Sequence, residues 1–243
     1  IAEDLNNFDD YQRAFISNIS HDFRSPLTSI HGYAQAMLDG TIPYEAQEKY
    51  LNIILSETDR LTNLTSNLLE LNSFNGDNVL LDITTFNICE TIVQTVNTLE
   101  GTAAKKEISF VLDYNTQKEL LVEADESKIH QVLYNLIDNA VKFSHNNSEI
   151  KISLRKKGAK VFVSVKDSGI GIPKESLNKV FDRFYKTDIS RGKDKRGTGL
   201  GLSISKEIIQ AHNQTINVVS TVDVGTEFVF TLKYHSKKQE ASS

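Results

Sequence analysis

Asp39-Gly40-Thr41-Ile42-Pro43 divides the first 72 residues into two long stretches with one kind of pattern. Asp, Gly and Pro in close succession form a helix-stop and turn signal. On both sides of this turn, apolar residues recur in steps of three and four, as on one face of an α-helix. The first stretch carries Ile16, Ile19, Phe23, Ile30, Tyr33 and Met37, and the second carries Leu51, Ile54, Leu61 and Leu68. The sequence predicts two long helices that form an antiparallel hairpin over residues 1–74.

Four further leucines make the apolar stripe of this hairpin wider than two helices can cover. They are Leu55, Leu64, Leu69 and Leu71. A four-helix bundle made by two chains would bury the stripe. The alternative is a hairpin that packs on the second domain of its own chain. We favour the bundle, and we therefore expect a homodimer through the N-terminal helices.

The pattern changes after a short polar linker at residues 73–78. Asn87-Ile88-Cys89-Glu90 resembles a capping box that begins a helix, and alternating apolar and polar residues farther along are typical of strands. We expect helices at 87–103, 125–140 and 200–211, and strands at 108–112, 120–123, 150–155, 161–166, 216–220 and 228–232. This mixture predicts an α+β fold, an α/β sandwich over residues 75–236, followed by a polar tail at 237–243.

Composition excludes several classes of protein. The 243 residues are 39 % hydrophobic, which permits a sizeable core, and their net charge of −5 argues against a nucleic-acid binder. Cys89 is the only cysteine, so the chain has neither an internal disulfide framework nor a cysteine-based zinc site. No apolar run approaches the roughly 20 residues of a membrane helix, so we expect no membrane contact by this fragment. Because it begins at Ile1, we expect a longer parent protein.

Two glycine-rich segments, Asp167–Ile172 and Gly197–Leu202, are the main signs of a ligand site. An acidic side chain that follows a strand can accept a hydrogen bond from an exocyclic amine, and glycines beside it let a flat ring approach. Free N–H groups at the start of a helix favour phosphate oxygens. The spacing is neither that of a P-loop nor that of a dinucleotide fingerprint. Each segment alone is weak evidence, since glycine clusters are often ordinary turns, but together they predict a nucleotide site.

The helix before these segments carries Asn135, Asn139 and Lys142 on one face. Amide oxygens are hard ligands that can hold Mg²⁺, and a lysine can contact a phosphate. Taken alone, this face is better interpreted as the polar, solvated face of an amphipathic helix. Farther along, residues 182–196 hold six basic and three acidic residues. A basic segment beside a phosphate site is typical of a lid, and the alternative is a solvated surface loop.

His21 is the histidine with distinctive neighbours, since Asp22 follows it and Ser25 lies one turn further along the same side of the helix. A solvent-facing imidazole beside a carboxylate can act as a nucleophile, because the carboxylate can orient the ring and take its proton. Pro26 removes a backbone hydrogen bond just beyond. Geometry alone favours a bystander role for this histidine.

Ser20-His21-Asp22-Phe23-Arg24-Ser25-Pro26-Leu27 resembles the phosphoacceptor box of bacterial sensor histidine kinases. The asparagine helix, the paired phenylalanines of Phe181–Phe184 and both glycine segments resemble the remaining boxes of this family, in order and spacing. Val224-Gly225-Thr226-Glu227-Phe228 resembles its closing element. The resemblance extends from about residue 15 to residue 232. It implies a dimerisation and histidine-phosphotransfer hairpin followed by a catalytic ATP-binding domain with a Bergerat-type fold.

The resemblance implies that His21 is phosphorylated from MgATP, with Asp22 as its acid/base neighbour, and that a response regulator receiver domain accepts the phosphoryl group. Ser25 stands where threonine or asparagine is usual, a position linked to phosphatase activity toward the regulator. The family usually works in the cytoplasm, as part of a parent protein anchored in the plasma membrane.

The resemblance also assigns the nucleotide site. Asp167 would bind the adenine amine, and Phe143 would line the adenine pocket. Asn139 and Asn135 would ligate Mg²⁺, and Lys142 would contact phosphate. The other nucleotide-binding residues that it implies are Gly169, Gly171, Arg191, Gly197, Thr198, Gly199, Leu200 and Gly201.

Two other functions remain open at this point. The first is an ATPase of the related gyrase or chaperone type, which places a glutamate where this chain has Asn135. The second is a dimeric ATP-sensing scaffold without kinase activity, against which the intact His21 and glycine segments argue.

Overall fold

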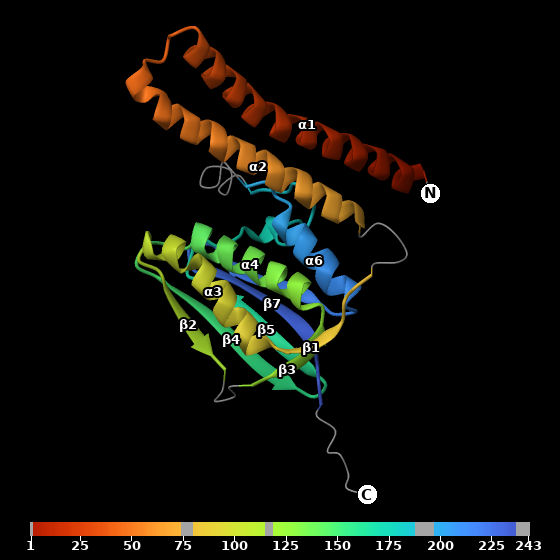
Figure 1. Cartoon of the computed structure of the whole chain (residues 1–243). Helices are drawn as coiled ribbons and strands as arrows, with labels where there is room; N and C mark the ends of the chain where they lie inside the picture. Colours follow the sequence, from red (N-terminus) through yellow and green to blue (C-terminus); the bar gives the residue numbers. More distant parts are fainter. Residues whose placement is uncertain (1, 74–79, 115–118, 188–196, 237–243) are drawn as a thin grey trace, which may run out of the picture. The chain divides into compact units, whose positions relative to one another are not determined.

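The computed structural model describes residues 2–73, 80–114, 119–187 and 197–236, with side chains from residue 16 onward. The chain divides near Asn72 and Ser73 into two compact units, one helical and one that contains the sheet (Figure 1).

The helical unit is a hairpin, as the sequence predicts. Its elements are α1 (Ala2–Leu38), the short 3₁₀ helix η1 (Tyr44–Ala46) and α2 (Gln47–Ser73). The turn between the helices has Gly40 in the left-handed region, with φ of 77°. The carboxylate of Asp39 accepts a hydrogen bond of 3.0 Å from the backbone N–H of Thr41. The first helix thus ends here because Gly40 adopts a left-handed backbone and Asp39 caps the turn.

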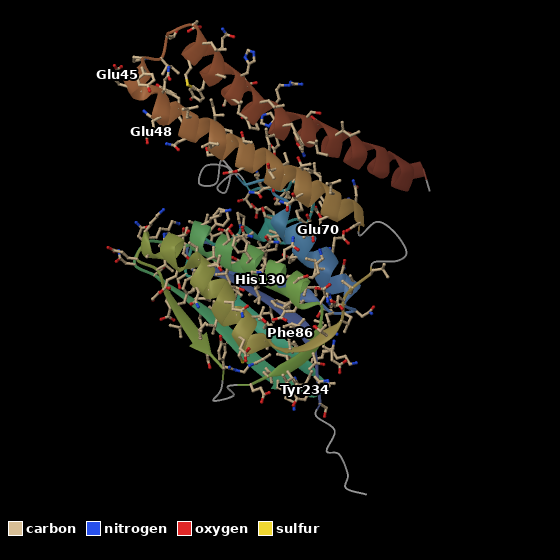
Figure 2. The ribbon with its side chains drawn as sticks, viewed as in Figure 1. Glu45, Glu48, Glu70, Phe86, His130 and Tyr234 are labelled. Carbon is tan, nitrogen blue, oxygen red and sulfur yellow. The ribbon has the colours of Figure 1, made fainter. Side chains whose placement is uncertain are left out.

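Local charge and ring packing support the second helix of the hairpin. Glu45 and Glu48 lie at the beginning of η1 and α2 (Figure 2), where negative charge interacts favourably with the helix dipole. The rings of Tyr33 and Tyr50 pack α1 against α2 with their centroids 5.1 Å apart.

The leucines that widen the apolar stripe differ in exposure. Leu64 and Leu71 are buried, whereas Leu55 and Leu69 are 62 % and 66 % exposed. Part of the stripe on α2 is therefore open to solvent in the single chain.

The second unit is built on a seven-stranded sheet with one parallel pair of strands. The strands are β1 (Thr84–Asn87), β2 (Ser109–Asp113), β3 (Leu121–Ala124), β4 (Glu149–Lys157), β5 (Lys160–Lys166), β6 (Ile216–Thr221) and β7 (Gly225–Tyr234). Their order is β1-β3-β7-β5-β4-β2, and β6 also pairs with β7. Among the described strands, β2 and β4 pair in parallel and every other pair is antiparallel.

Three helices cover one face of the sheet, with α4 between the other two (Figure 1). They are α3 (Ile88–Ala104), α4 (Glu126–Phe143) and α6 (Gly201–Ala211). Asp125 caps α4 by accepting a hydrogen bond of 3.2 Å from the N–H of Lys128. The apolar face of α4 is buried, from Ile129 to Val141, and each fully buried leucine or isoleucine stabilises the fold by about 1.5–3 kcal/mol. This packing fixes α4, which carries the predicted asparagines.

The predicted α+β sandwich is confirmed, with one strand that the sequence did not predict. This strand is β1, which pairs with β3 from Thr84 opposite Ala124. It contains a single buried residue, Phe86. The four residues of β1 include one apolar residue, so they show no alternation of apolar and polar residues that would predict a strand. The strand forms because its backbone pairs with β3.

Candidate functional site

The candidate nucleotide site begins at Asp167, the first residue after β5. Its side chain is buried, and its Oδ1 accepts hydrogen bonds from the backbone N–H groups of Gly169 at 2.9 Å and Thr226 at 3.2 Å. Burial raises the pKa of the Asp167 carboxyl, and these two N–H groups oppose the shift. The loop thus holds one carboxylate oxygen firmly in a poorly solvated place. Such a group suits recognition of a ligand N–H group.

Gly169 brings this loop against the end of α4. A Cβ on Gly169 would collide with the carbonyl group of Phe143, so no other residue fits there. The N–H of Ile170 donates to the same carbonyl oxygen at 3.2 Å, and Ser144 and Gly169 form an isolated β-bridge. The structure therefore brings Phe143 and the Asp167 loop together, as the resemblance implied.

Gly171 and Gly225 join the Asp167 loop to the turn between β6 and β7. Gly171 has φ of 68°, and a Cβ there would collide with the carbonyl of Thr221. A Cβ on Gly225 would collide with the carbonyl oxygen of Asp167. In the sequence, Gly225-Thr226 stood out only as part of the closing element, without a role of its own. Thr226 belongs to the site because its N–H holds Asp167.

The second glycine segment continues into the first turn of α6, which begins at Gly201, and it contacts α4. Gly199 has φ of 71° and lies against the backbone of Phe184, whose N–H donates to the carbonyl oxygen of Gly199 at 3.0 Å. Leu200 is fully buried. Next to it, Gly201 lies against Asn135, which donates 3.1 Å to the Gly201 carbonyl oxygen. The amide of Asn135 also donates to the hydroxyl of Ser205 at 3.3 Å.

Asn135 therefore joins α4 to α6. The chain has an amide at this position, and not a carboxylate that could activate water. Gly197 and Thr198, the first two residues of the segment, are half-buried.

The other predicted residues of α4 lie along its last turns. Asn139 is half-buried, and its amide makes no hydrogen bond to any residue that the structure describes. It can therefore offer a hard oxygen to a cation. Lys142 forms an ion pair of 2.7 Å with Asp138, and Phe143 is half-buried. The side-chain NH₂ group of Asn135, the other predicted metal ligand, is held by α6, and its side-chain oxygen accepts none of these hydrogen bonds.

His21 lies on α1 in the helical unit. Its imidazole is 83 % exposed, and Nδ1 lies 3.3 Å from Oδ1 of Asp22, which is 16 % exposed. Ser25 is also exposed, one turn later, and α1 continues through Pro26 without interruption. The sequence predicted both the outward histidine and its carboxylate neighbour.

Part of the predicted lid lies outside the described residues. Arg191 and the rest of residues 188–196 belong to that part. Among the described basic residues of this segment, Arg183 forms an ion pair of 3.3 Å with Glu207 on α6.

The structure combines three features expected of an ATP-binding phosphotransferase: a buried carboxylate flanked by glycines, a glycine-rich helix start and an outward histidine on a helical hairpin. Two family models match the chain. Residues 11–76 match the His Kinase A phospho-acceptor domain, and residues 124–236 match the histidine kinase-, DNA gyrase B- and HSP90-like ATPases. The chain belongs to the sensor histidine kinases, a family of ATP-dependent transferases.

Individual relatives agree with this assignment. The sensor histidine kinase WalK of Bacillus subtilis is 35 % identical over 237 residues, which is 96 % of this chain and 38 % of WalK. The solved catalytic domain of the histidine kinase ThkA is 36 % identical with a TM-score of 0.56, over 63 % of this chain and 96 % of that one. ThkA in complex with the response regulator TrrA is 32 % identical with a TM-score of 0.74, and the match covers 93 % of this chain and 63 % of that one. This chain thus spans well under half the length of the Bacillus relative.

Proposed function

We propose that this chain transfers the γ-phosphoryl group of ATP to His21 and then to an aspartate of a response regulator. The observation that carries the proposal is the contact between Nδ1 of His21 and the carboxylate of Asp22. A carboxylate oxygen can only accept, so we assign the tautomer in which the ring nitrogen that faces it carries the proton. Nε2 of the exposed ring then keeps its lone pair for attack.

The proposed step balances at this histidine. Nε2 attacks the γ-phosphorus, the bond to the bridging oxygen breaks, and ADP leaves. The imidazole becomes cationic as the new N–P bond forms, and the Nδ1 proton passes to Asp22. Phosphoryl transfer depends mainly on positioning and charge neutralisation, so a base beside the nucleophile and cations near the phosphates are the main requirements.

For the nucleotide, we assign adenine to Asp167 and Phe143, and the phosphates to Lys142 and the glycine segment that begins at Gly197. The buried carboxylate oxygens and the close-packed glycines of the Asp167 loop support the first assignment. For Mg²⁺, the available amide of Asn139 fits a hard cation, with Asn135 as a second oxygen donor. The cation would neutralise charge on the phosphates when bound.

We further propose that residues 1–74 form the dimerisation and phosphotransfer unit, and residues 75–236 the catalytic unit. The solved complex of ThkA with TrrA supports a receiver domain as the partner. The exposed leucines of α2 support a homodimer through the helical hairpin. No helix in the described residues is long and apolar enough to cross a membrane. Because the reaction consumes ATP, we assign it to the cytoplasm.

The proposal predicts a phosphohistidine at one position. Purified chain incubated with radiolabelled ATP and Mg²⁺ should acquire a label that is lost in acid and stable in base. His21→Ala should lose the label entirely, because the attacking nitrogen is gone. His31→Ala removes another exposed histidine of α1 and should label like the wild type. Labelling of His21→Ala at the wild-type rate would refute the assignment.

A further inference from the structure

The C-terminal end of α4 has an unusual set of hydrogen-bond donors. The last four carbonyl groups of an α-helix have no partner within the helix, so other groups must bind them. At this end the N–H of Ser144 donates to the carbonyl oxygen of Ala140 at 3.0 Å, which completes the last helical bond. The carbonyl groups that follow belong to Val141, Lys142, Phe143 and Ser144.

A single lysine binds three of these four carbonyl groups. Nζ of Lys106 lies 2.8 Å from the oxygen of Val141, 2.7 Å from that of Lys142 and 3.4 Å from that of Ser144. The fourth oxygen, that of Phe143, accepts the N–H of Ile170 from the Asp167 loop, as described above. One ammonium group and one loop amide therefore bind the whole C-terminal end of the helix. A positive charge there also interacts favourably with the helix dipole.

Lys106 follows α3 in the chain, and the segment around it is itself held in place. The N–H groups of Lys106 and Ile108 both donate to the carbonyl oxygen of Ala103, and the N–H of Asn147 donates to the carbonyl oxygen of Lys106. The lysine backbone is thus fixed between the end of α3 and the loop after α4. Because this backbone is fixed, the half-buried side chain of Lys106 extends to the end of α4 from a constant position.

The turn that Lys106 binds is the turn that carries the assigned nucleotide ligands. Lys142 and Phe143 lie on it, and Asn139 lies one turn earlier. The carbonyl group of Phe143 is packed against Gly169 and leaves no space for a Cβ there. The N–H of Gly169 in turn holds Asp167. From these contacts we infer that Lys106 is a positioning residue for the nucleotide site, acting through the end of α4 without touching the ligand. The inference rests on the proposed function.

The test compares nucleotide affinity in four variants of the full chain by calorimetric titration with ADP and Mg²⁺. Lys106→Met keeps the apolar stem but removes all three donors, and the dissociation constant should rise at least tenfold. Lys106→Arg restores a cation with several donors, and the constant should return to within about threefold of the wild type. Lys105→Met removes the same charge from the exposed neighbouring residue and should bind like the wild type.

A fourth variant separates positioning from general loss of stability. Thr95→Ala alters a fully buried residue of α3, whose hydroxyl donates 2.7 Å to the carbonyl oxygen of Thr91. It should lower the melting temperature and leave ADP affinity within about twofold of the wild type. Two outcomes would overturn the inference. The first is that Thr95→Ala and Lys106→Met have the same melting temperature and lose the same ADP affinity. The second is that Lys106→Met binds ADP as tightly as the wild type. Wild-type chain that binds no nucleotide would overturn the proposed function and this inference together.

Discussion

At the scale of single residues, Asp167 combines a cost for folding with the adenine-binding role that we propose for it. Burial raises the pKa of its carboxyl, so the buried site works against the charged form that would accept a hydrogen bond from the ligand. An asparagine in its place would keep an oxygen for the N–H groups of Gly169 and Thr226 but would present an NH₂ group where the adenine amine needs an acceptor. We expect Asp167→Asn to raise the dissociation constant of ADP at least tenfold, since hydrogen bonds to charged groups contribute about 1.5–3 kcal/mol.

The same variant should be at least as thermally stable as the wild type at pH 7.5. The folded-state pKa of this carboxyl is raised, so the unfolded chain loses the proton first, and wild-type stability falls as the pH rises toward that pKa. The melting-temperature advantage of Asp167→Asn should therefore shrink as the pH is lowered from 7.5 toward the ordinary aspartate pKa of about 3.9. Thermal unfolding across this range measures the effect. A variant several degrees less stable at pH 7.5, with normal ADP affinity, would contradict both expectations.

At the scale of elements, the loop after β5 and the turn between β6 and β7 depend on each other. Gly171 has a left-handed backbone and no room for a Cβ against Thr221, and the N–H of Asp223 donates 2.9 Å to the carbonyl oxygen of Ile170. Gly171→Ala must therefore displace this turn, and Thr226 lies just beyond it at the beginning of β7. We expect lower stability in urea unfolding and weaker ADP binding.

Gly158 offers a matched control, because it has φ of 60° but no atom within 4 Å of the position that a Cβ would take. Gly158→Ala should lower the free energy of unfolding by about 1–2 kcal/mol, the cost of a left-handed backbone alone. Its ADP affinity should stay unchanged. If Gly171→Ala were no worse than Gly158→Ala in both measurements, the contact with Thr221 would have no structural importance.

Helices and strands whose own residues show a periodic apolar pattern could be predicted from the sequence. Elements that form only through contacts with distant parts of the chain could not. The apolar spacing of α4 and its capping Asp125 predicted this helix, and the glycine segments indicated the site. By contrast, β1 has one buried residue, and Lys106 binds carbonyl groups 35 to 38 residues away in the chain. Thr226 acts through a backbone N–H, which its residue type does not reveal. Such long-range contacts leave no local pattern.

At the scale of the whole molecule, the open apolar stripe of α2 bears on the proposed homodimer. Leu55 and Leu69 are two heptads apart, so they lie on the same face of the helix. Burying a leucine contributes about 1.5–3 kcal/mol, and a symmetric dimer buries each of these residues twice. Replacing both with glutamate should therefore convert a dimer into monomers, because four carboxylates would enter an apolar interface.

Sedimentation velocity at micromolar protein concentrations tests this expectation with the full chain. The variant Leu55→Glu/Leu69→Glu should sediment as a monomer and still bind ADP, since Asp167 and Asn139, the residues proposed for adenine and Mg²⁺, lie in the other unit. Leu80→Glu adds a charge at a leucine that is 96 % exposed and lies beyond the hairpin, so it should remain dimeric. A wild-type monomer at these concentrations, or a double variant that still dimerises, would show that α2 does not form the interface. The stripe would then need another partner to cover it.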